Sequence, residues 1–368
     1  MGVYKIFPTK DATIYSAYPN KNTGLDEILD ASCLIDIANL PQTSRFLIQF
    51  SQEEITDVLI NKISGSSWSA SLQCFVANIE GLNTDTIIDV FPISGSWDMG
   101  TGRYLYQPEY TDGVSWYWQN YSGSTLWPTS SFTSEVTASW VTSTPGGGVW
   151  YTNLFSSSIS SSQTLAYKSL KDLNLNVTNI VFQWWTESID NNGFIIKQRE
   201  EWGSNENYQP SLKYFSVDTH TIYPPDLEFR WRDFLWVTGS SSIISTTEMV
   251  ATIEQNPGIF YPGSINKFRI YTRPEYPARV FQTASLYTTN YYLPSSSYYA
   301  LVDLETNETI IDFDTQFTQI SADTTSNYFT IWMDGLEPER QYQILIKTII
   351  GGETLILDNN YYFKVINQ

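Results

Sequence analysis

Histidine, cysteine and basic residues are scarce in this 368-residue chain, and each shortage excludes a class of function. With one histidine, His220, a histidine-rich zinc or iron site cannot be built, and a Ser-His-Asp triad would have to use that residue. The two cysteines, Cys33 and Cys74, are too few for a disulfide scaffold and lack the CxxC spacing of a zinc or redox site. We therefore expect no metal and no cofactor, and a fold that is stabilised by packing.

Acidic residues outnumber basic ones by almost two to one. The chain has 20 Lys and Arg against 39 Asp and Glu, which gives a formal net charge of −19. No basic face is available to neutralise a nucleic-acid backbone or an anionic membrane. No stretch reaches the roughly 18 to 20 apolar residues of a membrane-spanning helix. We expect neither nucleic-acid binding nor membrane insertion.

The first residues predict a strand rather than an export signal. A secretory signal would open with a positive patch followed by an apolar run, whereas Met1–Lys10 alternates like a strand at once. This start indicates synthesis in a host cytosol without a signal peptide.

Aromatic side chains are the abundant feature. They make up 15% of the residues and hydrophobic residues 42%, which is too apolar for disorder, while 16% charged residues are too few for a helical bundle. Most segments show period-two alternation or short β-branched and aromatic runs between turn residues. The clearest predicted strands are 45–50, 180–185, 194–197, 227–236, 265–271, 299–304, 328–333 and 342–350. Helical spacing is limited to 52–59 and 165–173, with Ser51 and Thr164 as candidate caps.

Many short strands with turn-rich connections predict an all-β fold of stacked antiparallel sheets, as in sandwiches and jelly rolls. The polar run Thr238–Ser245 indicates a boundary, which gives a first domain over 1–237 and a second over 238–368. Within the first domain, a Trp-, Tyr-, Ser- and Gly-rich insertion at about 97–162 is typical of long loops at one end of a sandwich.

Several short motifs in the first domain occur in the order of a known module. Asp11-Ala12-Thr13, Tyr18-Pro19-Asn20-Lys21-Asn22-Thr23-Gly24 and Arg45-Phe46-Leu47-Ile48-Gln49-Phe50 open the series. Val114-Ser115-Trp116, Asn191-Asn192-Gly193-Phe194-Ile195-Ile196-Lys197 and Gln209-Pro210-Ser211-Leu212-Lys213-Tyr214 continue it. Over residues 5–235 the chain resembles DNRLRE-type β-sandwich domains.

That resemblance implies a jelly-roll-like sandwich of the kind found in microbial surface proteins and in virion proteins of tailed phages, where it serves as a spacer or a carbohydrate-binding module. It implies no catalytic residues. The insertion after Trp97 departs from the pattern, so no ligand groove is carried over. In the second domain, 335–342 (GLEPERQY) is similar to the turn and tyrosine corner of immunoglobulin-like and fibronectin-type modules, and 305–308 carries a hairpin signal. The resemblance there implies a smaller immunoglobulin-like β-sandwich.

The insertion holds the candidate binding residues. They are aromatic side chains, which anchor protein interfaces, stack on sugar faces or fill a core. The candidates are Trp116, Tyr117, Trp118, Tyr121, Trp127, Trp140, Trp150 and Tyr151.

Three other groups offer chemistry but are explained more simply by structural roles. His220 is expected to be an ordinary strand or loop residue. The pair Asp312 and Asp314 has the composition of a glycosidase acid and nucleophile, yet fits a solvated strand face. The run Asp190–Gly193 offers oxygen ligands for calcium but lacks EF-hand spacing, and a tight turn is its expected use.

Together these observations predict a non-enzymatic structural protein of a tailed-phage virion, at the neck, collar, tail or capsid exterior. Its expected partners are other virion proteins, which it binds through its aromatic loops, and it is expected to form a homo-oligomer or symmetric ring. The alternative is a carbohydrate-binding adhesin module that contacts a host glycan. A polysaccharide-degrading enzyme that uses Asp312 and Asp314 ranks below both.

Overall fold

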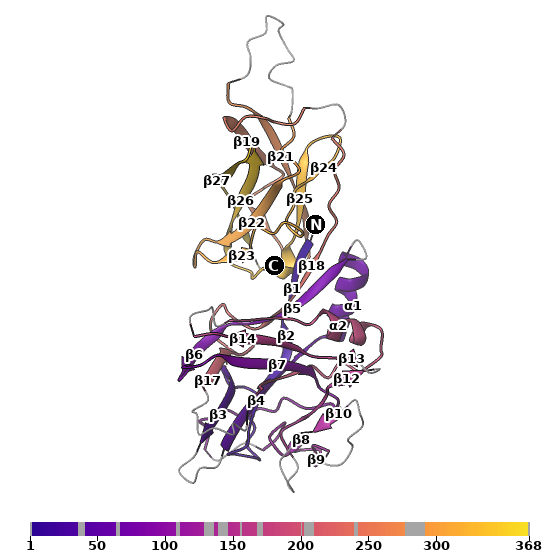
Figure 1. Ribbon diagram of the computed structural model, residues 1–368, viewed down its shortest axis with the longest axis vertical. Coiled ribbons are helices and arrows are strands. Elements are labelled where there is room, and N and C mark those ends of the chain that lie inside the picture. The colour runs from indigo at the N-terminus through magenta and orange to yellow at the C-terminus, as the bar shows by residue number, and fades with distance from the viewer. Residues whose placement is uncertain are drawn as a thin grey trace, which may run out of the picture. The chain divides into compact units, whose positions relative to one another are not determined.

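The computed structural model describes residues 2–35, 41–63, 67–107, 111–128, 136–138, 146–154, 157–167, 172–199, 201, 210–238, 242–276 and 291–366. Almost all of their regular structure is strand, so the predicted all-β sandwich fold is confirmed. The chain forms two compact units (Figure 1). The large unit comprises Ile6–Ile60 and Ser69–Glu228, and the small unit comprises Met1–Lys5, Asn61–Trp68 and Phe229–Gln368. The division after Glu228 lies nine residues before the predicted one, and two amino-terminal segments belong to the small unit.

An eight-stranded antiparallel sheet is the framework of the large unit. Its order is β14-β7-β16-β4-β3-β17-β6, and β2 also pairs with β4. The strands are β2 (Pro8–Tyr15), β3 (Ile28–Ile35), β4 (Pro41–Phe50), β6 (Val76–Glu80), β7 (Thr86–Pro92), β14 (Ser161–Leu165), β16 (Phe194–Gln198) and β17 (Ser211–Phe215). A four-stranded sheet has the order β1-β18-β5-β15, with β1 (Gly2–Ile6), β18 (Asp226–Trp231), β5 (Trp68–Cys74) and β15 (Leu173–Asn176).

The predicted insertion contains short strands as well as loops. These are β8 (Trp118–Asn120), β9 (Thr125–Leu126), β10 (Val136–Ala138), β11 (Val149–Tyr151), β12 (Asn153–Leu154) and β13 (Ser157–Ser158), which pair as three two-stranded ribbons. The ribbon of β10 and β11 is tied to the large sheet by a bridge between Ile93 and Trp150.

Two helices lie in the large unit, and one of them corrects a prediction. Helix α1 (Gln52–Asp57) starts at the predicted cap, since the Ser51 hydroxyl accepts a hydrogen bond from the Glu54 amide at 3.3 Å; a π-helical segment, η1 (Val58–Lys62), continues it. The predicted strand 180–185 is wrong, because it lies in helix α2 (Thr178–Trp185). Ile180, Val181 and Trp184 are its buried residues, which is helical spacing.

The second predicted helix, 165–173, is also wrong. Leu165 ends strand β14 and Leu173 begins β15, and both leucines are buried as alternating strand residues. Residues 168–171 lie outside the described part of the chain. In the described residues no helix has the length and apolar character needed to cross a membrane.

The small unit is a sandwich of two sheets. One has the order β19-β21-β25-β24 and the other β20-β27-β26-β22-β23. Their strands are β19 (Met249–Glu254), β21 (Ile265–Pro274), β25 (Asn327–Trp332), β24 (Ser321–Ala322), β20 (Ile259–Phe260), β27 (Glu353–Val365), β26 (Gln341–Ile350), β22 (Ser297–Asp303) and β23 (Thr309–Ile311), with a 3-10 turn η2 (Met333–Gly335). The Phe329 ring stacks on Tyr299 of the opposite sheet at 4.5 Å between centroids, so the two sheets share one core.

The predicted tyrosine corner is present in the small unit. The Tyr342 hydroxyl donates a hydrogen bond to the carbonyl oxygen of Glu337 at 3.0 Å, and the Tyr342 ring packs against Phe363. The predicted hairpin signal also lies at a turn, between β22 and β23, where Asn307 has a φ of 56°.

The amino-terminal strand packs within the small unit through an aromatic and ionic cluster. The Lys62 ammonium lies 3.7 Å from the centroid of the Tyr4 ring and 3.4 Å from a carboxylate oxygen of Asp334. The Tyr4 hydroxyl donates to the same Asp334 oxygen at 3.3 Å, and its ring contacts Trp332 edge to face. Residues from both ends of the sequence therefore complete one unit.

Candidate functional site

Most tryptophans of the insertion belong to a core. Trp116, Trp127 and Trp150 are buried and pack with Trp97 in one cluster of the large unit. Tyr117 is partly buried and packs against this cluster, and Tyr151 is half-buried. The core alternative therefore describes these three tryptophans. Trp140 lies outside the described residues.

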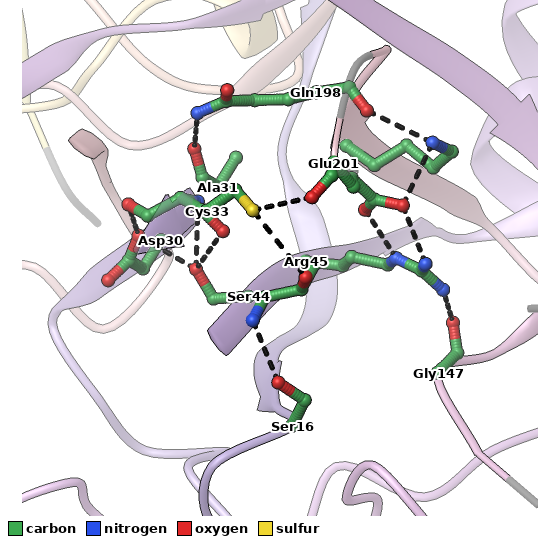
Figure 2. Close-up of polar contacts among 12 residues, drawn as sticks. Ser16, Asp30, Ala31, Cys33, Ser44, Arg45, Gly147, Gln198 and Glu201 are labelled. Carbon is green, nitrogen blue, oxygen red and sulfur yellow. Dashed lines mark hydrogen bonds and ion pairs between the residues drawn. The ribbon is translucent and has the colours of Figure 1, made fainter. Parts of the chain in front are cut away.

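A buried arginine connects this aromatic core to the large sheet. Arg45 of β4 donates two hydrogen bonds to the carboxylate of Glu201, at 2.6 and 2.7 Å, and a third to the carbonyl oxygen of Gly147 (Figure 2). Its guanidinium group lies 5.0 Å from the Trp116 ring centroid and 5.2 Å from that of Trp150. The hydrogen bonds of this guanidinium group go to other residues of the large unit. We call Arg45, Glu201 and Lys197 the arginine cluster.

Lys197 adds a second cation beside the carboxylate of the arginine cluster. Its ammonium donates to the second carboxylate oxygen of Glu201 at 3.2 Å. Burial by itself would raise the pKa of Glu201, but the charges and hydrogen bonds of Arg45 and Lys197 outweigh it and lower that pKa. Burial also lowers the pKa of Lys197. Two cations on one carboxylate fix a structure and leave no free base for chemistry.

Strand β3 adds neutral contacts to the same region (Figure 2). The Cys33 thiol donates to the carbonyl oxygen of Glu201, and the Gln198 amide donates to the carbonyl oxygen of Ala31 at 2.8 Å. The Ser44 hydroxyl donates to Asp30 at 2.9 Å. Burial raises the pKa of the Cys33 thiol, which disfavours the reactive thiolate. Sequence reasoning missed Glu201, because no local pattern relates it to Arg45, 156 positions away.

The motif Tyr18–Gly24 is hydrogen-bonded to Met99, Gly102 and Val114 through its residue Asn22. The fully buried Asn22 amide donates to the carbonyl oxygens of Met99 and Val114 at 2.7 and 2.8 Å, and its oxygen accepts from the amides of Gly24 and Gly102 at 3.1 and 2.8 Å. Every hydrogen-bonding position of this side chain is used. Asn22 is therefore a structural brace, not an exposed binding residue.

Exposed aromatic residues gather where this brace reaches the surface. We define the aromatic rim as Tyr18, Tyr104, Tyr106, Trp118 and Tyr121; Tyr18, Tyr106 and Tyr121 are 39%, 43% and 39% exposed, and Tyr104 and Trp118 are half-buried. The Trp118 ring meets Tyr121 edge to face at 5.0 Å, and the Tyr18 ring meets Tyr104 edge to face at 5.8 Å.

The loop that carries Tyr18 joins the two halves of the rim. The indole nitrogen of Trp118 donates to the side-chain oxygen of Asn20 at 3.0 Å. The carbonyl oxygen of Pro19 accepts from the Tyr117 amide at 3.0 Å and from the Ser115 hydroxyl at 2.8 Å. Below the rim, Lys21 lies 4.6 Å from the Tyr18 ring centroid and 5.0 Å from that of Tyr104. Of the candidate residues, Trp118 and Tyr121 thus remain available for binding.

A buried carboxyl lies in the same unit. Asp11 of β2 accepts the amide of Val217 at 2.7 Å on one oxygen, while the other oxygen has no hydrogen-bond partner among the described residues. Burial raises the pKa of Asp11 to about 8, and the nearby Asp218 and Asp26 add to that shift against the Val217 hydrogen bond. Asp11 is therefore protonated at neutral pH.

The candidate catalytic residues have structural positions. His220 is 85% exposed in a turn, with Nε2 at 3.6 Å from Glu27. Asp314 accepts the amides of Gln316 and Phe317 at 2.7 and 2.9 Å, as a turn-forming aspartate does, while Asp312 is exposed and accepts the amide of Phe313. Both carboxylates thus accept backbone amides of the small unit.

The possible calcium run is a turn as well. The Asn191 side chain accepts the Gly193 amide at 3.1 Å and donates to the Phe50 carbonyl oxygen at 3.1 Å, and Gly193 has a φ of 86°. The Trp97 indole donates to the Asn192 carbonyl oxygen at 2.9 Å. Within the part of the chain that the structure describes, no group of three His, Cys, Asp or Glu residues is arranged to hold a metal ion.

Comparison with known proteins yields only remote likenesses. No family model matches the chain, and no curated protein matches it. Among solved structures, it is similar to a β-glucuronidase of Parabacteroides merdae, with 10% identity, a TM-score of 0.17, and coverage of 85% of this chain and 29% of that one. It is also similar to a DUF4785 family protein of Legionella pneumophila, with 10% identity, a TM-score of 0.19, and coverage of 98% and 65%. The chain spans less than two thirds of the length of either protein.

Proposed function

We propose that this protein is a non-enzymatic structural component of a tailed-phage virion that binds a neighbouring virion protein through the aromatic rim. The observation that carries the proposal is the separation of the aromatic residues into two sets. Trp116, Trp127 and Trp150 stabilise the unit from within, whereas the rim places further rings on its surface above a fully hydrogen-bonded brace. Exposed, pre-ordered Tyr and Trp side chains are the residues that most often anchor protein interfaces.

Two further features support a binding role over a chemical one. Two of the ionisable groups that could act as acids or bases are engaged in structure: Glu201 pairs with two cations, and Asp314 forms a turn. The sequence resemblance to surface and virion sandwich modules supplies the phage setting. A position at the neck, collar, tail or capsid exterior and a ring-like assembly follow from that setting.

Protein composition of the particle tests this proposal directly. Mass spectrometry of purified phage particles should find the chain at a stoichiometry of a symmetric ring, and electron microscopy should place its density beside another virion protein with the rim at the contact. Particles that lack the chain, or in which the rim faces solvent on every copy, would refute the proposal.

A carbohydrate-binding module is the second candidate, and one observation favours it. The half-buried Trp118 ring and the exposed Tyr121 ring lie beside the amides of Asn20 and Asn120 and the carboxylate of Asp98. Rings flanked by polar groups suit a sugar face and its hydroxyls. Calorimetric titration with host polysaccharide separates the candidates: Trp118→Ala should abolish heat of binding if a glycan is the ligand, and the leading proposal expects no binding in the parent protein.

A further inference from the structure

The charge of the chain is concentrated in the unit that carries the aromatic rim. The large unit contains 9 basic and 24 acidic residues, a net charge of −15, whereas the small unit contains 11 and 15, a net charge of −4. Charge of one sign around a surface attracts partners of the opposite sign and repels like-charged ones. The rim is therefore placed on the strongly anionic part of the molecule.

At least four of the nine cations of the large unit are engaged in described contacts, and its 24 carboxylates outnumber all nine. Lys21 is buried and donates to the carbonyl oxygen of Tyr104 at 3.1 Å. Arg45 and Lys197 belong to the buried arginine cluster. Arg103 pairs with Glu27 at 3.0 Å. None of these four groups offers an unpaired positive charge at the rim.

Carboxylates lie next to the rim on both of its sides. Asp26 and Glu27 lie by the Tyr104 side, where Arg103 is their neighbouring cation, and Asp98 lies by the Trp118 side, where it accepts the Asn120 amide. Burial raises the pKa of Asp26, and burial together with Glu27 raises that of Asp218, against the attraction of Arg103. Three carboxylates, Asp26, Glu27 and Asp218, thus share Arg103 as a neighbouring cation at the Tyr104 side.

We propose that the aromatic rim binds a Lys- and Arg-rich segment of a partner protein, with the partner's cations seated over the exposed rings and against the surrounding carboxylates. Cation–π contact and charge attraction act on the same groups in this arrangement, and Tyr18 and Tyr104 already receive one cation, Lys21, on their inner side. This inference rests on the proposed protein-binding role and names the chemistry of the partner. Anionic glycans and nucleic acids are disfavoured by the same charges.

A matched pair of double variants tests the inference without changing the charge of the protein. The rim variant is Tyr18→Ser with Tyr121→Ser, in which two rings of 39% exposure are removed. The control variant is Phe182→Ser with Trp185→Ser, which removes a ring pair of 42% and 39% exposure on helix α2 of the same unit. Both variants are first compared with the parent by circular dichroism and thermal unfolding.

The probe is a fluorescent peptide of alternating Arg and Gly residues, measured by anisotropy with the full chain at low and at high salt. We expect the parent and the control variant to bind it alike, the rim variant to bind at least about fivefold more weakly, and all binding to weaken as salt rises. Equal affinity of both variants would mean diffuse charge attraction only, and would overturn the inference. So would absence of peptide binding, or rim-dependent binding of a neutral oligosaccharide instead.

The outcome is separable from that of the proposed function. Detection of the chain in purified particles does not depend on the rim's ligand, so a protein that is present in the virion but fails the peptide test would retain the structural role and lose only the cationic partner.

Discussion

Arg45 and Glu201 form a doubly hydrogen-bonded ion pair inside the large unit although 156 positions separate them in the chain. The pair also positions the loop that carries Gly147, since the third Arg45 hydrogen bond ends there. Its geometry is the planar match of a guanidinium group to a carboxylate, which lysine cannot reproduce.

Arg45→Met should lower the free energy of unfolding of the large unit by about 3–5 kcal/mol, because it leaves the Glu201 carboxylate buried with Lys197 as its remaining cation. Arg45→Lys keeps the positive charge but loses the doubly hydrogen-bonded pairing with the Glu201 carboxylate. Its free energy of unfolding should therefore lie between those of the methionine variant and the parent. Urea unfolding followed by tryptophan fluorescence measures both variants, since Trp116 and Trp150 lie at the site. A methionine variant as stable as the parent would show that the pair contributes nothing.

The stability of the large unit should respond to pH through Asp11. The pKa of Asp11 is raised from the ordinary carboxyl value of about 3.8 to about 8 in the folded chain. The contribution of Asp11 to the free energy of unfolding is therefore largest below about pH 3.8 and declines as the pH rises to about 8. Asp11→Asn removes this decline while its amide oxygen still accepts the Val217 amide. The variant should therefore gain stability relative to the parent steadily between about pH 4 and pH 8, by a few kcal/mol in all. Parallel stability curves for the two proteins would contradict the prediction.

Asn22→Asp should disrupt the brace below the aromatic rim. A carboxylate would face the carbonyl oxygens of Met99 and Val114, so two hydrogen bonds are lost and like-charged atoms are buried together. We expect a loss of about 2–4 kcal/mol. Hydrogen exchange at the Gly24 and Gly102 amides should quicken, because both donate to Asn22. Asn83→Asp, at an exposed position, serves as the control and should leave both quantities unchanged.

Tyr342→Phe should lower the stability of the small unit by about 1 kcal/mol. The substitution keeps the ring packing against Phe363 and removes only the hydrogen bond to the Glu337 carbonyl oxygen. Tyr362→Phe, in which the hydroxyl belongs to a mostly exposed ring, is the matched control. Thermal unfolding of the two variants should differ, and identical midpoints would argue against a role for the corner.

The fold class could be predicted because alternation is a local signal. Strand β26 shows a period-two pattern, strands β4 and β16 are short runs of β-branched, aromatic and other apolar residues, and the turn 335–342 indicates its tyrosine corner in a single motif. Helix α2 was mispredicted for a related reason. Its sequence TNIVFQWW consists largely of β-branched and aromatic residues, and only its burial pattern, imposed by packing, is helical.

The site was less accessible from the sequence. The composition of the insertion identifies its aromatic residues but does not say which face of each short strand is buried, so Trp127 and Trp118 look alike until the β8–β9 ribbon is folded. Glu201 carries no local signal at all, because its role is defined by Arg45, which is far away in the sequence. The pairing of residues that are far apart in the chain depends on the topology of the fold, which cannot be read from a single sequence.

The small unit is assembled from three separate stretches of the chain, Met1–Lys5, Asn61–Trp68 and Phe229–Gln368. During synthesis on the ribosome, the first two stretches emerge long before the third. The Tyr4 ring can therefore contact Trp332, and Lys62 can pair with Asp334, only after the third stretch has been translated. The uninterrupted stretch Ser69–Glu228 is synthesised in between, which gives the other unit time to fold first. Completion of the small unit is thereby postponed until the last of its three stretches has been synthesised.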